Sequence, residues 1–310
     1  MVHIESQSEL PCKALTHADV CAVMVTYNPD LSLKQNVEAL LPQVGKVIIV
    51  DNASSPAEQR LIAHVASVFK VEVIWNEKNQ GIAMGLNKGI DLALSGGQYS
   101  WIATFDQDSR VQPTYLATMF EAYATCPFRD GVALIGANYA LGTYEYHDEP
   151  IVASNKPAFL EVKTLMTSGT LVKSCVFPKC GQFDESLFMD YVDHEFCLRL
   201  RQHGFRAIQA RHAVLVHRLG SPTSHHILGK RFMVSNYSPS RHYSNARNRL
   251  LVYHRYLTSE TLWVLQDVGK WLKETMKMVL VESNRAEKLV SIAQGVRDAI
   301  KELLLSRAHR

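Results

Sequence analysis

The sequence of 310 residues lacks a long hydrophobic run. No stretch of about 18 or more residues is uninterruptedly apolar, so none is a candidate for a transmembrane helix. Residues 1–20 contain two glutamates and no basic start followed by an apolar core, so they do not resemble a secretory signal. We expect residues 1–19 to form a short leader and the protein to be cytoplasmic.

Cysteine is sparse, and one long segment lacks acidic residues. The six cysteines include no C-x-x-C pair, which argues against a disulfide framework and against a zinc site. The formal net charge is only +3, but residues 199–255 contain eleven Lys or Arg, seven His and no Asp or Glu. Such a segment forms either a solvated face or an anion site. Because the chain as a whole is not strongly basic, we favour an anion site.

The first half of the chain alternates strand-like and helical patterns. Apolar runs lie at residues 20–27, 46–52, 71–76 and 100–106, and the first three are each followed by apolar residues at helical spacing. This rhythm predicts an α/β fold with a Rossmann-like, mostly parallel central sheet and helices on both faces. The helical period returns near the end of the chain, where we expect C-terminal helices. We place the main domain at 20–256 and a C-terminal helical extension at 257–310.

Each of the four predicted strands ends in polar residues. These are Thr26, Tyr27 and Asn28; Asp51 and Asn52; Asn76 with Asn79; and Asp106, Gln107 and Asp108. Ligands of parallel sheets bind beyond the carboxyl ends of the strands. We therefore expect these side chains to meet at one edge of the sheet and to bind a ligand there.

The stretch TFDQDSR, residues 104–110, carries the most specific of these strand ends. Alternation along an extended chain sends Asp106 and Asp108 to the same side. Two carboxylates at that spacing are costly to ionise unless a cation or an array of donors lies between them. A divalent ion bound to a diphosphate would supply the charge. The alternative is a solvated acidic turn that caps the next helix.

A glycine-containing helix is predicted to begin near Asn79 and Gly81. Gly85 and Gly89 follow four residues apart and leave one stripe of the helix bare, so the helix can lie close to the sheet. Its N-terminus would then point backbone N–H groups at a nucleotide. Tight helix packing alone explains the glycines equally well.

Two weaker candidates come from other strand ends. Asp51 can accept a hydrogen bond from the imide N–H of a pyrimidine base, and Asn52 offers both a donor and an acceptor, although turn formation also explains this pair. His217 ends an apolar run. It is either a structural histidine or, together with the two aspartates above, part of an octahedral site for Mg²⁺ or Mn²⁺.

Three acidic residues crowd the start of a predicted helix, and its dipole explains at least one of them. They are Asp190, Asp193 and Glu195. Arg199 follows Glu195 at i+4, a favourable helical ion pair, so Glu195 is the structural member. Asp193 is then the candidate for a general base, a role that needs a carboxylate able to approach a substrate hydroxyl.

Taken in order and spacing, these segments resemble the family 2 inverting glycosyltransferases of the GT-A fold. The segments are VTYNP, IIVDNAS, NQGIAMGLNKG, TFDQDS, TSGTLV and FMDYVDHEFCLRLRQHG. The last two, together with HYSNARNRLLVYHRY, look most like the bacterial rhamnosyltransferase branch. The resemblance covers residues 20–256, which would be the GT-A catalytic domain, and extends more loosely over 257–310.

The resemblance implies metal-dependent inverting transfer of a sugar, L-rhamnose from dTDP-β-L-rhamnose, to a hydroxyl of a cell-surface glycan precursor. The residues implied to bind the nucleotide sugar are Thr26, Tyr27, Asn28, Asp51, Asn52, Asn79, Gly81, Asp106 and Gln107. Asp108 with His217 would hold Mg²⁺ or Mn²⁺, and Asp193 would be the catalytic base. The sequence departs from the family pattern at Val192, where Glu is commonest, and at Gln80, where many relatives have Arg.

Three alternatives stay open at this point. The donor could be a UDP-sugar. A sugar-phosphate nucleotidyltransferase also combines a parallel sheet, a nucleotide and Mg²⁺, but it normally has a glycine-rich loop after its first strand, which VTYNPDLS lacks. An inactive binding subunit is the third alternative, and the intact Asp108 and Asp193 argue against it.

The C-terminal extension suggests a further partner. Lys270, Lys273 and Lys277 lie in sequence beside Trp263 and Trp271, a pattern that can rest on the anionic inner face of the cell membrane, where lipid-linked acceptors reside. Packing on the catalytic domain, or on a second subunit of a homodimer, explains the same pattern. We expect no nucleic acid partner.

Overall fold

The structure, a computed structural model, describes residues 15–141, 157–217, 223–227 and 230–308. Most of the predicted leader, residues 1–19, lies outside this part of the chain. The first described element is the short 3-10 turn η1 (His17–Asp19), which runs directly into the first strand.

The predicted alternation of strands and helices is confirmed in the first half of the chain. Its parallel strands are β1 (Val20–Thr26), β2 (Lys46–Asp51), β3 (Glu72–Trp75) and β4 (Trp101–Asp106). The connecting helices are α1 (Ser32–Leu40), α2 (Pro56–Phe69) and α3 (Gly81–Ser95), with the turn η2 (Leu41–Gln43) after α1. The strands lie in the order β3-β2-β1-β4, so the carboxyl ends of all four point to one edge.

The second half of the chain extends the same sheet with less regular pairing. It contributes β5 (Ser109–Val111), β6 (Val132–Leu141), β7 (Phe159–Val162), β8 (Thr170–Lys173) and β9 (Arg206–His217). From β4 the order continues β8-β6-β9-β5, and β7 pairs with the beginning of β9. β8 is antiparallel to its neighbours, whereas β6 and β9 are parallel. The predicted α/β fold with a mostly parallel sheet is therefore confirmed.

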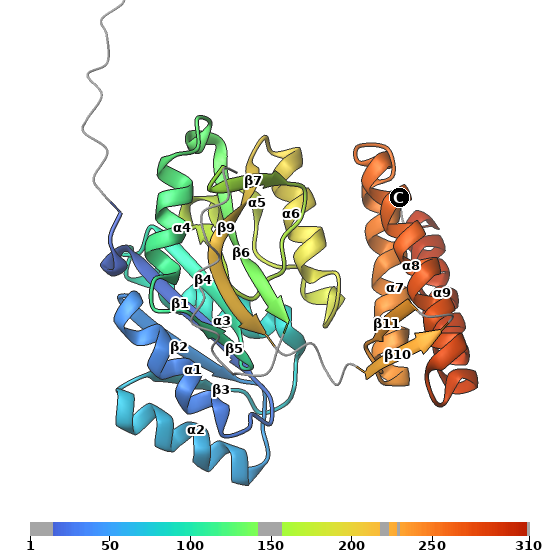
Figure 1. Cartoon of the computed structure of the whole chain (residues 1–310), viewed down its shortest axis with the longest axis horizontal. Coiled ribbons are helices and arrows are strands. Elements are labelled where there is room, and N and C mark those ends of the chain that lie inside the picture. Colours follow the sequence, from blue (N-terminus) through green and yellow to red (C-terminus); the bar gives the residue numbers. More distant parts are fainter. Residues whose placement is uncertain (1–14, 142–156, 218–222, 228–229, 309–310) are drawn as a thin grey trace, which may run out of the picture.

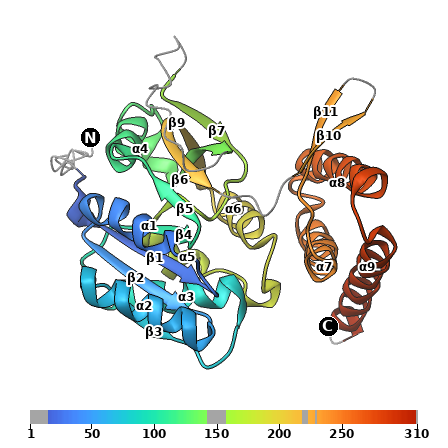
Figure 2. The ribbon, with the colours of Figure 1, turned by 60° about the horizontal axis from the view of Figure 1, so that its bottom comes forward.

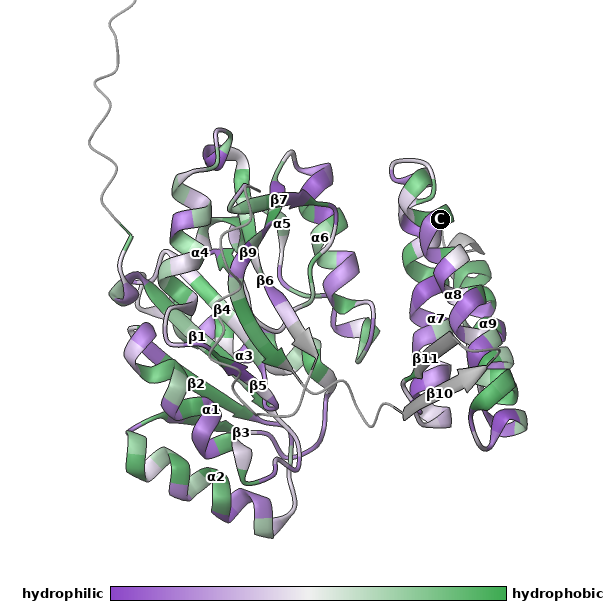
Figure 3. Cartoon of the chain, in the orientation of Figure 1, coloured by the Kyte–Doolittle hydropathy of each residue, from purple (hydrophilic) through white to green (hydrophobic). Residues whose placement is uncertain are grey.

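Helices cover both faces of this sheet, as predicted (Figure 1). One face carries α1, α2 and α4 (Tyr115–Ala124), and the other carries α3, α5 (Phe177–Cys180) and α6 (Val192–Gln202). Side chains of β1 alternate strictly between the two cores: Val23 packs toward α3, and Met24 toward α1. Figure 3 shows β1 and β2 as mostly hydrophobic, as expected when both faces are buried. Short 3-10 turns, η3 (Arg129–Gly131), η4 (Ser174–Val176) and η5 (Glu185–Leu187), link the outer elements.

Helix α3 lies unusually close to the sheet, and its glycines allow this approach. A Cβ atom added to Gly89 would lie 2.3 Å from Cγ1 of Val23, and one added to Gly85 would lie 2.9 Å from Cγ1 of Val25. No side chain fits there without movement. The predicted bare stripe of α3 is thus confirmed as a packing surface against β1.

The C-terminal helices form a group beside the sheet (Figures 1 and 2). They are α7 (Pro239–Tyr256), α8 (Thr261–Val281) and α9 (Arg285–Ala308), accompanied by the hairpin of β10 (Thr223–Ile227) and β11 (Lys230–Val234). α7 packs along α9 so closely that a Cβ atom on Gly295 would lie 2.4 Å from the carbonyl oxygen of Tyr243. The division of the chain at 256/257 stays a prediction. Of the described helices, none combines the length and the apolar character that crossing a bilayer requires.

Helix α8 turns its tryptophans inward and a row of aliphatic residues outward. Trp263 is buried, and Trp271 stacks under Arg249, so neither lies on the lysine-bearing surface suggested by the sequence. The exposed residues of the opposite side are Leu262, Leu265, Leu272, Met276 and Leu280, which are 58–70% exposed. Lys270 and Lys273 are exposed beside this row, and Lys277 is half-buried and paired with Glu274.

Candidate active site

A cavity of about 660 Å³ opens at the carboxyl ends of β1 and β4, between α3, the start of α6 and α7. The position is the one predicted from the polar strand ends. The predicted site residues that line it are Thr26, Tyr27, Asn52, Asn79, Gly81, Asp106, Gln107, Asp108 and Asp193. Asn28, Asp51 and His217 are not among its lining residues.

The turn that carries Asp106 and Asp108 is held by a distant segment. The hydroxyl of Ser168 accepts a hydrogen bond from the backbone N–H of Asp106 at 3.0 Å and lies 2.6 Å from the hydroxyl of Ser109. Gly169, in the left-handed region with φ +69°, donates its N–H to the carbonyl of Thr104 at 2.8 Å. The TSG segment thus fixes both aspartates at the cavity wall, where both are half-buried.

Gln107, between the two aspartates, ties the end of β4 to the end of β1. Its Oε1 accepts from the backbone N–H of Tyr27 at 2.7 Å, and its Nε2 donates to the carbonyl of Tyr27 at 3.1 Å. The amide of Asn36 donates to the Gln107 carbonyl at 2.8 Å. Gln107 therefore has a positioning function, and Tyr27, which lines the cavity, is 49% exposed.

Asp51 and Asn28 lie behind the cavity wall. Asp51 is fully buried and accepts from Thr26 Oγ1 at 3.1 Å and from the backbone N–H of Ser54 at 3.0 Å. Asn28, with φ +49°, accepts from the backbone N–H of Ser55 at 2.8 Å. Both residues shape the loops after β1 and β2, and the structure gives neither a direct position in the cavity.

A chain of amides connects the ends of β2 and β3 to α3. Asn52 donates to the Gly81 carbonyl at 2.9 Å and accepts from Asn76 at 2.8 Å, and Lys88 donates to Asn76 at 2.6 Å. The backbone N–H of Ile82 donates to the carbonyl of Phe188 at 2.7 Å. The expectation that the start of α3 points its first N–H groups at a ligand is therefore wrong for Ile82, whose N–H is used by a neighbouring loop.

That loop, residues 188–191, is conformationally unusual. Phe188, Asp190 and Tyr191 all lie in the left-handed region, with φ +46°, +61° and +66°. Each such non-glycine residue costs on the order of 1–3 kcal/mol, and such conformations cluster at functional sites. α6 consequently begins at Val192, so Asp190 lies before the helix and not in its first turn. The amide of Asn248 holds the loop by donating to the carbonyls of Met189 and Asp190, at 2.7 and 3.1 Å.

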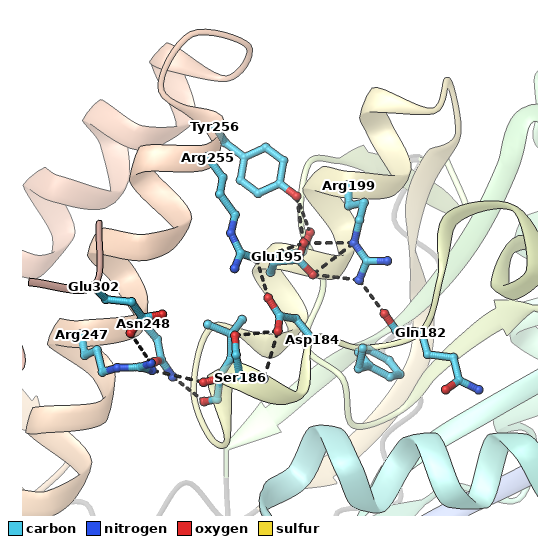
Figure 4. Close-up of polar contacts among 12 residues, drawn as sticks. Gln182, Asp184, Ser186, Glu195, Arg199, Arg247, Asn248, Arg255, Tyr256 and Glu302 are labelled. Carbon is cyan, nitrogen blue, oxygen red and sulfur yellow. Dashed lines mark hydrogen bonds and ion pairs between the residues drawn. The ribbon is translucent and has the colours of Figure 1, made fainter. Parts of the chain in front are cut away.

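The three acidic residues at the start of α6 have different environments. Glu195 is buried and pairs with Arg199, with Nη2 2.9 Å from Oε2, so the predicted i+4 ion pair is confirmed (Figure 4). Asp190 is paired with Arg241 at 3.1 Å, and burial raises its pKa, against the lowering effect of Arg241. Asp193 lines the cavity, where its Oδ1 accepts from the backbone N–H of His194 at 2.8 Å.

Sequence reasoning missed a buried polar cluster on α7 and α8. Nε of Arg249 lies 3.2 Å from Oδ2 of Asp267. The same Nε donates a hydrogen bond to the hydroxyl of Tyr191, and that hydroxyl donates one to Asp267. Tyr253 donates to Asp267 at 2.7 Å. Burial alone would raise the pKa of Asp267, but the Tyr191 hydrogen bond, the Arg249 charge and the Tyr253 hydrogen bond outweigh it and lower that pKa.

The acid-free segment 199–255 is mostly neutralised by acids from elsewhere. Arg201 pairs with Glu260 at 3.0 Å and Arg247 with Glu302 at 2.6 Å, and Arg255 pairs with Asp184 (Figure 4). Two of these pairs tie α7 to α9 and to the segment before α6, and the Arg201–Glu260 pair ties α6 to the start of α8. Among the described residues of the segment, the arginines that line the cavity are Arg241 and Arg249. The anion site suggested by the charge count stays a prediction, because the side chains of Arg218, Lys230 and Arg231 lie outside what the structure describes.

The predicted histidine ligand is only partly placed. The backbone of His217 pairs with Ser109, directly after Asp108, so the register brings His217 to the same end of the sheet. Its side chain lies outside what the structure describes. Within the described ranges, no group of three or more His, Cys, Asp or Glu side chains forms a metal cluster.

Comparison with known proteins agrees with this arrangement. The chain is 28% identical over 301 residues to the dTDP-rhamnosyl transferase RfbF of Shigella flexneri, covering 92% of this chain and 96% of that protein. Among solved structures, GalNAc-T7 with UDP, GalNAc and Mn²⁺ superposes with a TM-score of 0.60 at 12% identity, covering 96% of this chain and 58% of that one. Residues 1–349 of S. aureus TarS in complex with UDP-GlcNAc superpose with a TM-score of 0.57 at 13% identity, covering 91% and 81%. These two structures share the fold.

The family assignment comes from the first half of the chain. The sequence profile described as Glycosyl transferase family 2 matches residues 21–177, which include the four parallel strands, both aspartates of the β4–β5 turn and the TSG segment. This match sets aside a sugar-phosphate nucleotidyltransferase. The chain belongs to glycosyl transferase family 2 and is a glycosyltransferase with the GT-A fold.

Proposed function

We propose that this glycosyltransferase is a metal-dependent, inverting rhamnosyltransferase. It would move L-rhamnose from dTDP-β-L-rhamnose to a hydroxyl of a cell-surface glycan precursor. The donor is supported by the similarity to the S. flexneri dTDP-rhamnosyl transferase, which extends over nearly the whole of both chains.

The charge of the cavity wall is the observation that carries the proposal. Its charged residues, leaving histidine aside, are Asp106, Asp108, Asp190, Asp193, Asp267, Arg241 and Arg249. Among the described lining residues, five carboxylates thus stand against two guanidiniums, an acidic excess. A diphosphate entering alone would be repelled, so a divalent cation has to accompany it. The carboxylate oxygens of the β4–β5 turn are ligands that suit Mg²⁺ or Mn²⁺.

In this proposal Asp108, helped by Asp106, would hold the cation. The bound cation supplies charge neutralisation for the departing nucleoside diphosphate. Asp193 removes the proton of the acceptor hydroxyl as general base. The acceptor oxygen then attacks the anomeric carbon on the face opposite the diphosphate, so configuration inverts and a β-linked donor gives an α-L-rhamnoside. Tyr27 and Asn52 line the side of the cavity assigned to the nucleotide.

The test compares donors with and without metal. We expect the protein to bind and turn over dTDP-rhamnose in the presence of Mn²⁺ in preference to UDP-GlcNAc. We expect excess chelator, or Asp108→Ala, to remove most donor binding while the thermal unfolding midpoint stays near that of the parent. Donor affinity that persists in chelator would refute the role of the metal. Binding without any transfer to glycan acceptors would instead favour an inactive binding subunit.

We also infer that the protein works in the cytoplasm, at the inner face of the cell membrane. The exposed aliphatic row of α8, with Lys270 and Lys273 beside it, supports contact with an anionic surface where a lipid-linked acceptor would reside. The same row could instead cover a second copy of the chain, which would make a homodimer.

A further inference from the structure

Three residues that line the cavity have a buried polar atom without a hydrogen-bond partner among the described residues: Oδ2 of Asp190, Nδ1 of His194 and Nη1 of Arg249. Two of these atoms, those of Asp190 and Arg249, belong to charged groups of opposite sign. Because nearly all buried polar atoms are paired in folded proteins, such a pair of atoms needs an explanation.

Each of the two side chains is fixed through its other atoms. Oδ1 of Asp190 accepts from Nη2 and Nε of Arg241, at 3.1 and 3.3 Å. The guanidinium of Arg249 lies between the rings of Tyr191 and Trp271, 5.0 Å from each ring centre, and Asp267 holds its Nε. The unpaired carboxylate oxygen and the unpaired N–H group are therefore held in place and do not need to be ordered by a ligand.

The backbone that carries Asp190 also adopts an energetically unfavourable conformation. Asp190 and Tyr191 have φ +61° and +66°, and they lie between Met189 and the start of α6. Asn248, which caps the carbonyls of this loop, and Ile82, which binds the Phe188 carbonyl, keep it in that shape. A loop restrained from two sides in a disfavoured conformation is typical of a site organised before its ligand binds.

The chemistry of the two atoms selects a ligand class. A carboxylate oxygen only accepts hydrogen bonds and a guanidinium N–H only donates them, whereas a hydroxyl does both. A phosphate at this place would satisfy Arg249 but would be repelled by Asp190, and an ammonium group would do the opposite. Two hydroxyls of a neutral sugar satisfy both atoms. Phe188, which is 43% exposed, and Met166 also line the cavity and supply apolar surface for the C–H face of a sugar ring.

The location points to the sugar that is transferred. Asp190 stands three residues before Asp193, the proposed base. Burial would lower the pKa of Arg241, but the charges of Asp190 and, more weakly, Asp106 raise it. Arg241, which pairs with Asp190 at 3.1 Å, lines the cavity together with Asp106. In an in-line displacement the transferred sugar lies between the base and the diphosphate. Asp190 and Arg249 line the same cavity as Asp193 and the aspartates of the β4–β5 turn.

We propose that Asp190 Oδ2 and Arg249 Nη1 form the subsite that binds hydroxyls of the neutral sugar carried by the donor. This inference rests on the proposed function, since it assumes a nucleotide sugar in the cavity. In this proposal the two residues bind the sugar, and the β4–β5 turn, through its cation, binds the diphosphate. It predicts that they distinguish a nucleotide sugar from the same nucleotide without its sugar.

The experiment measures binding of dTDP and of dTDP-rhamnose by calorimetry in the presence of Mn²⁺. In Asp190→Asn the remaining oxygen can still face Arg241, and Arg249→Lys keeps the charge beside Asp267. We expect both variants to bind dTDP-rhamnose roughly 10- to 100-fold more weakly, the effect of losing one hydrogen bond to a charged group, while dTDP binding changes less than about 2-fold.

Two control variants perturb the same surroundings outside the cavity. Asp184→Asn alters another carboxylate paired with an arginine, Arg255, in the segment before α6. Tyr253→Phe removes a hydrogen bond to Asp267 without touching the cavity lining. Both are expected to retain the parent's difference between dTDP and dTDP-rhamnose. Thermal unfolding identifies any variant that fails to fold. If Arg249→Lys does not fold, Asp190→Asn still tests the proposal, because it leaves the Arg249–Asp267 pair in place.

The possible outcomes separate the two proposals. Equal loss of dTDP and dTDP-rhamnose binding in Asp190→Asn would assign Asp190 to the nucleotide and overturn the sugar subsite, as would unchanged binding of both. If the parent prefers UDP-GlcNAc, the same comparison is made with UDP, so the subsite is tested although the proposed donor is wrong. A parent that binds no nucleotide sugar would overturn both.

Discussion

Asp193 and Glu195 stand two residues apart at the start of α6, and replacing each by its amide should have opposite consequences. Asp193 lines the cavity, and the hydrogen bond that its Oδ1 accepts from the backbone N–H of His194, at 2.8 Å, can be kept by an asparagine oxygen. Asp193→Asn should therefore leave folding and donor binding near normal. Removing a general base costs about 10²–10⁴ in rate, equivalent to about 3–5 kcal/mol in the activation barrier.

The side chain of Glu195 is only 3% exposed and binds two other side chains, those of Arg199 and Tyr256. Arg199 donates to its Oε1 from Nε at 3.0 Å and to its Oε2 from Nη2 at 2.9 Å, and the hydroxyl of Tyr256 donates to Oε1 at 3.0 Å. Removing one charge of a buried pair costs about 3–5 kcal/mol because it leaves the other buried and uncompensated. For a chain of this size the thermal midpoint of Glu195→Gln should fall by roughly 5–10 °C.

The assay combines thermal unfolding with the rate of transfer at a temperature where both variants are folded. We expect Asp193→Asn to keep its midpoint and lose at least about 100-fold in rate, and Glu195→Gln to lose stability and keep most of its rate. Asp190→Asn, tested beside them, should retain more activity than Asp193→Asn at saturating donor. The assignment would be wrong if the transfer rate of Asp193→Asn stayed within a few-fold of the parent while Glu195→Gln or Asp190→Asn lost transfer. The general base would then be the residue whose replacement abolished transfer.

Three further predictions concern packing, pH and the outer surface. Gly89→Ala places a Cβ atom 2.3 Å from Val23 and should lower stability to urea by about 1–3 kcal/mol, and combining it with Val23→Ala should cost less than the sum of the two changes; strict additivity would contradict the close contact. The pKa of Asp267 is lowered in the folded protein, so its ionised form stabilises the fold. This stabilisation is present above the ordinary pKa of about 3.9 and is lost as pH falls through the lower folded pKa. Thermal midpoints measured from pH 5 downward should therefore fall more steeply in the parent than in Asp267→Asn, and parallel curves would contradict a stabilising role of the ionised Asp267. Sedimentation with anionic vesicles should pull down the parent but not Leu272→Glu or Lys273→Glu, whereas a dimer in solution without vesicle binding would favour the packing alternative.

Local patterns predicted the parallel half of the sheet and most of its ligand edge. Strand-like runs separated by helical spacing gave β1 to β4, and the bare stripe of α3 followed from two glycines four residues apart. The pairing of Glu195 with Arg199 was also predictable, because residues at i and i+4 of a helix are neighbours whatever surrounds them.

The missed features depend on contacts between segments far apart in sequence. Arg249 and Asp267 lie on different helices, and no periodicity relates them until α7 and α8 pack. The left-handed conformation of Asp190 and Tyr191 was hidden because a run such as DYVDHEF reads as continuous helix. The excess of arginine in residues 199–255 is explained in part by ion pairs whose acidic partners lie outside the segment. A count of charges along the sequence cannot distinguish such ion pairs from an anion site.

The position of β9 has a consequence for the order in which the molecule is made. In the described part of the chain, the three-residue strand β5 pairs with β9 alone, through Ser109 opposite His217 and Val111 opposite Leu215. About a hundred residues separate the two strands, which at roughly 5–20 residues per second is about 5–20 s of synthesis on the ribosome. During that interval β5, which follows the two aspartates of the β4–β5 turn, has no partner strand. A nascent chain of this enzyme would thus complete its first four parallel strands well before it acquires the turn that defines its active site.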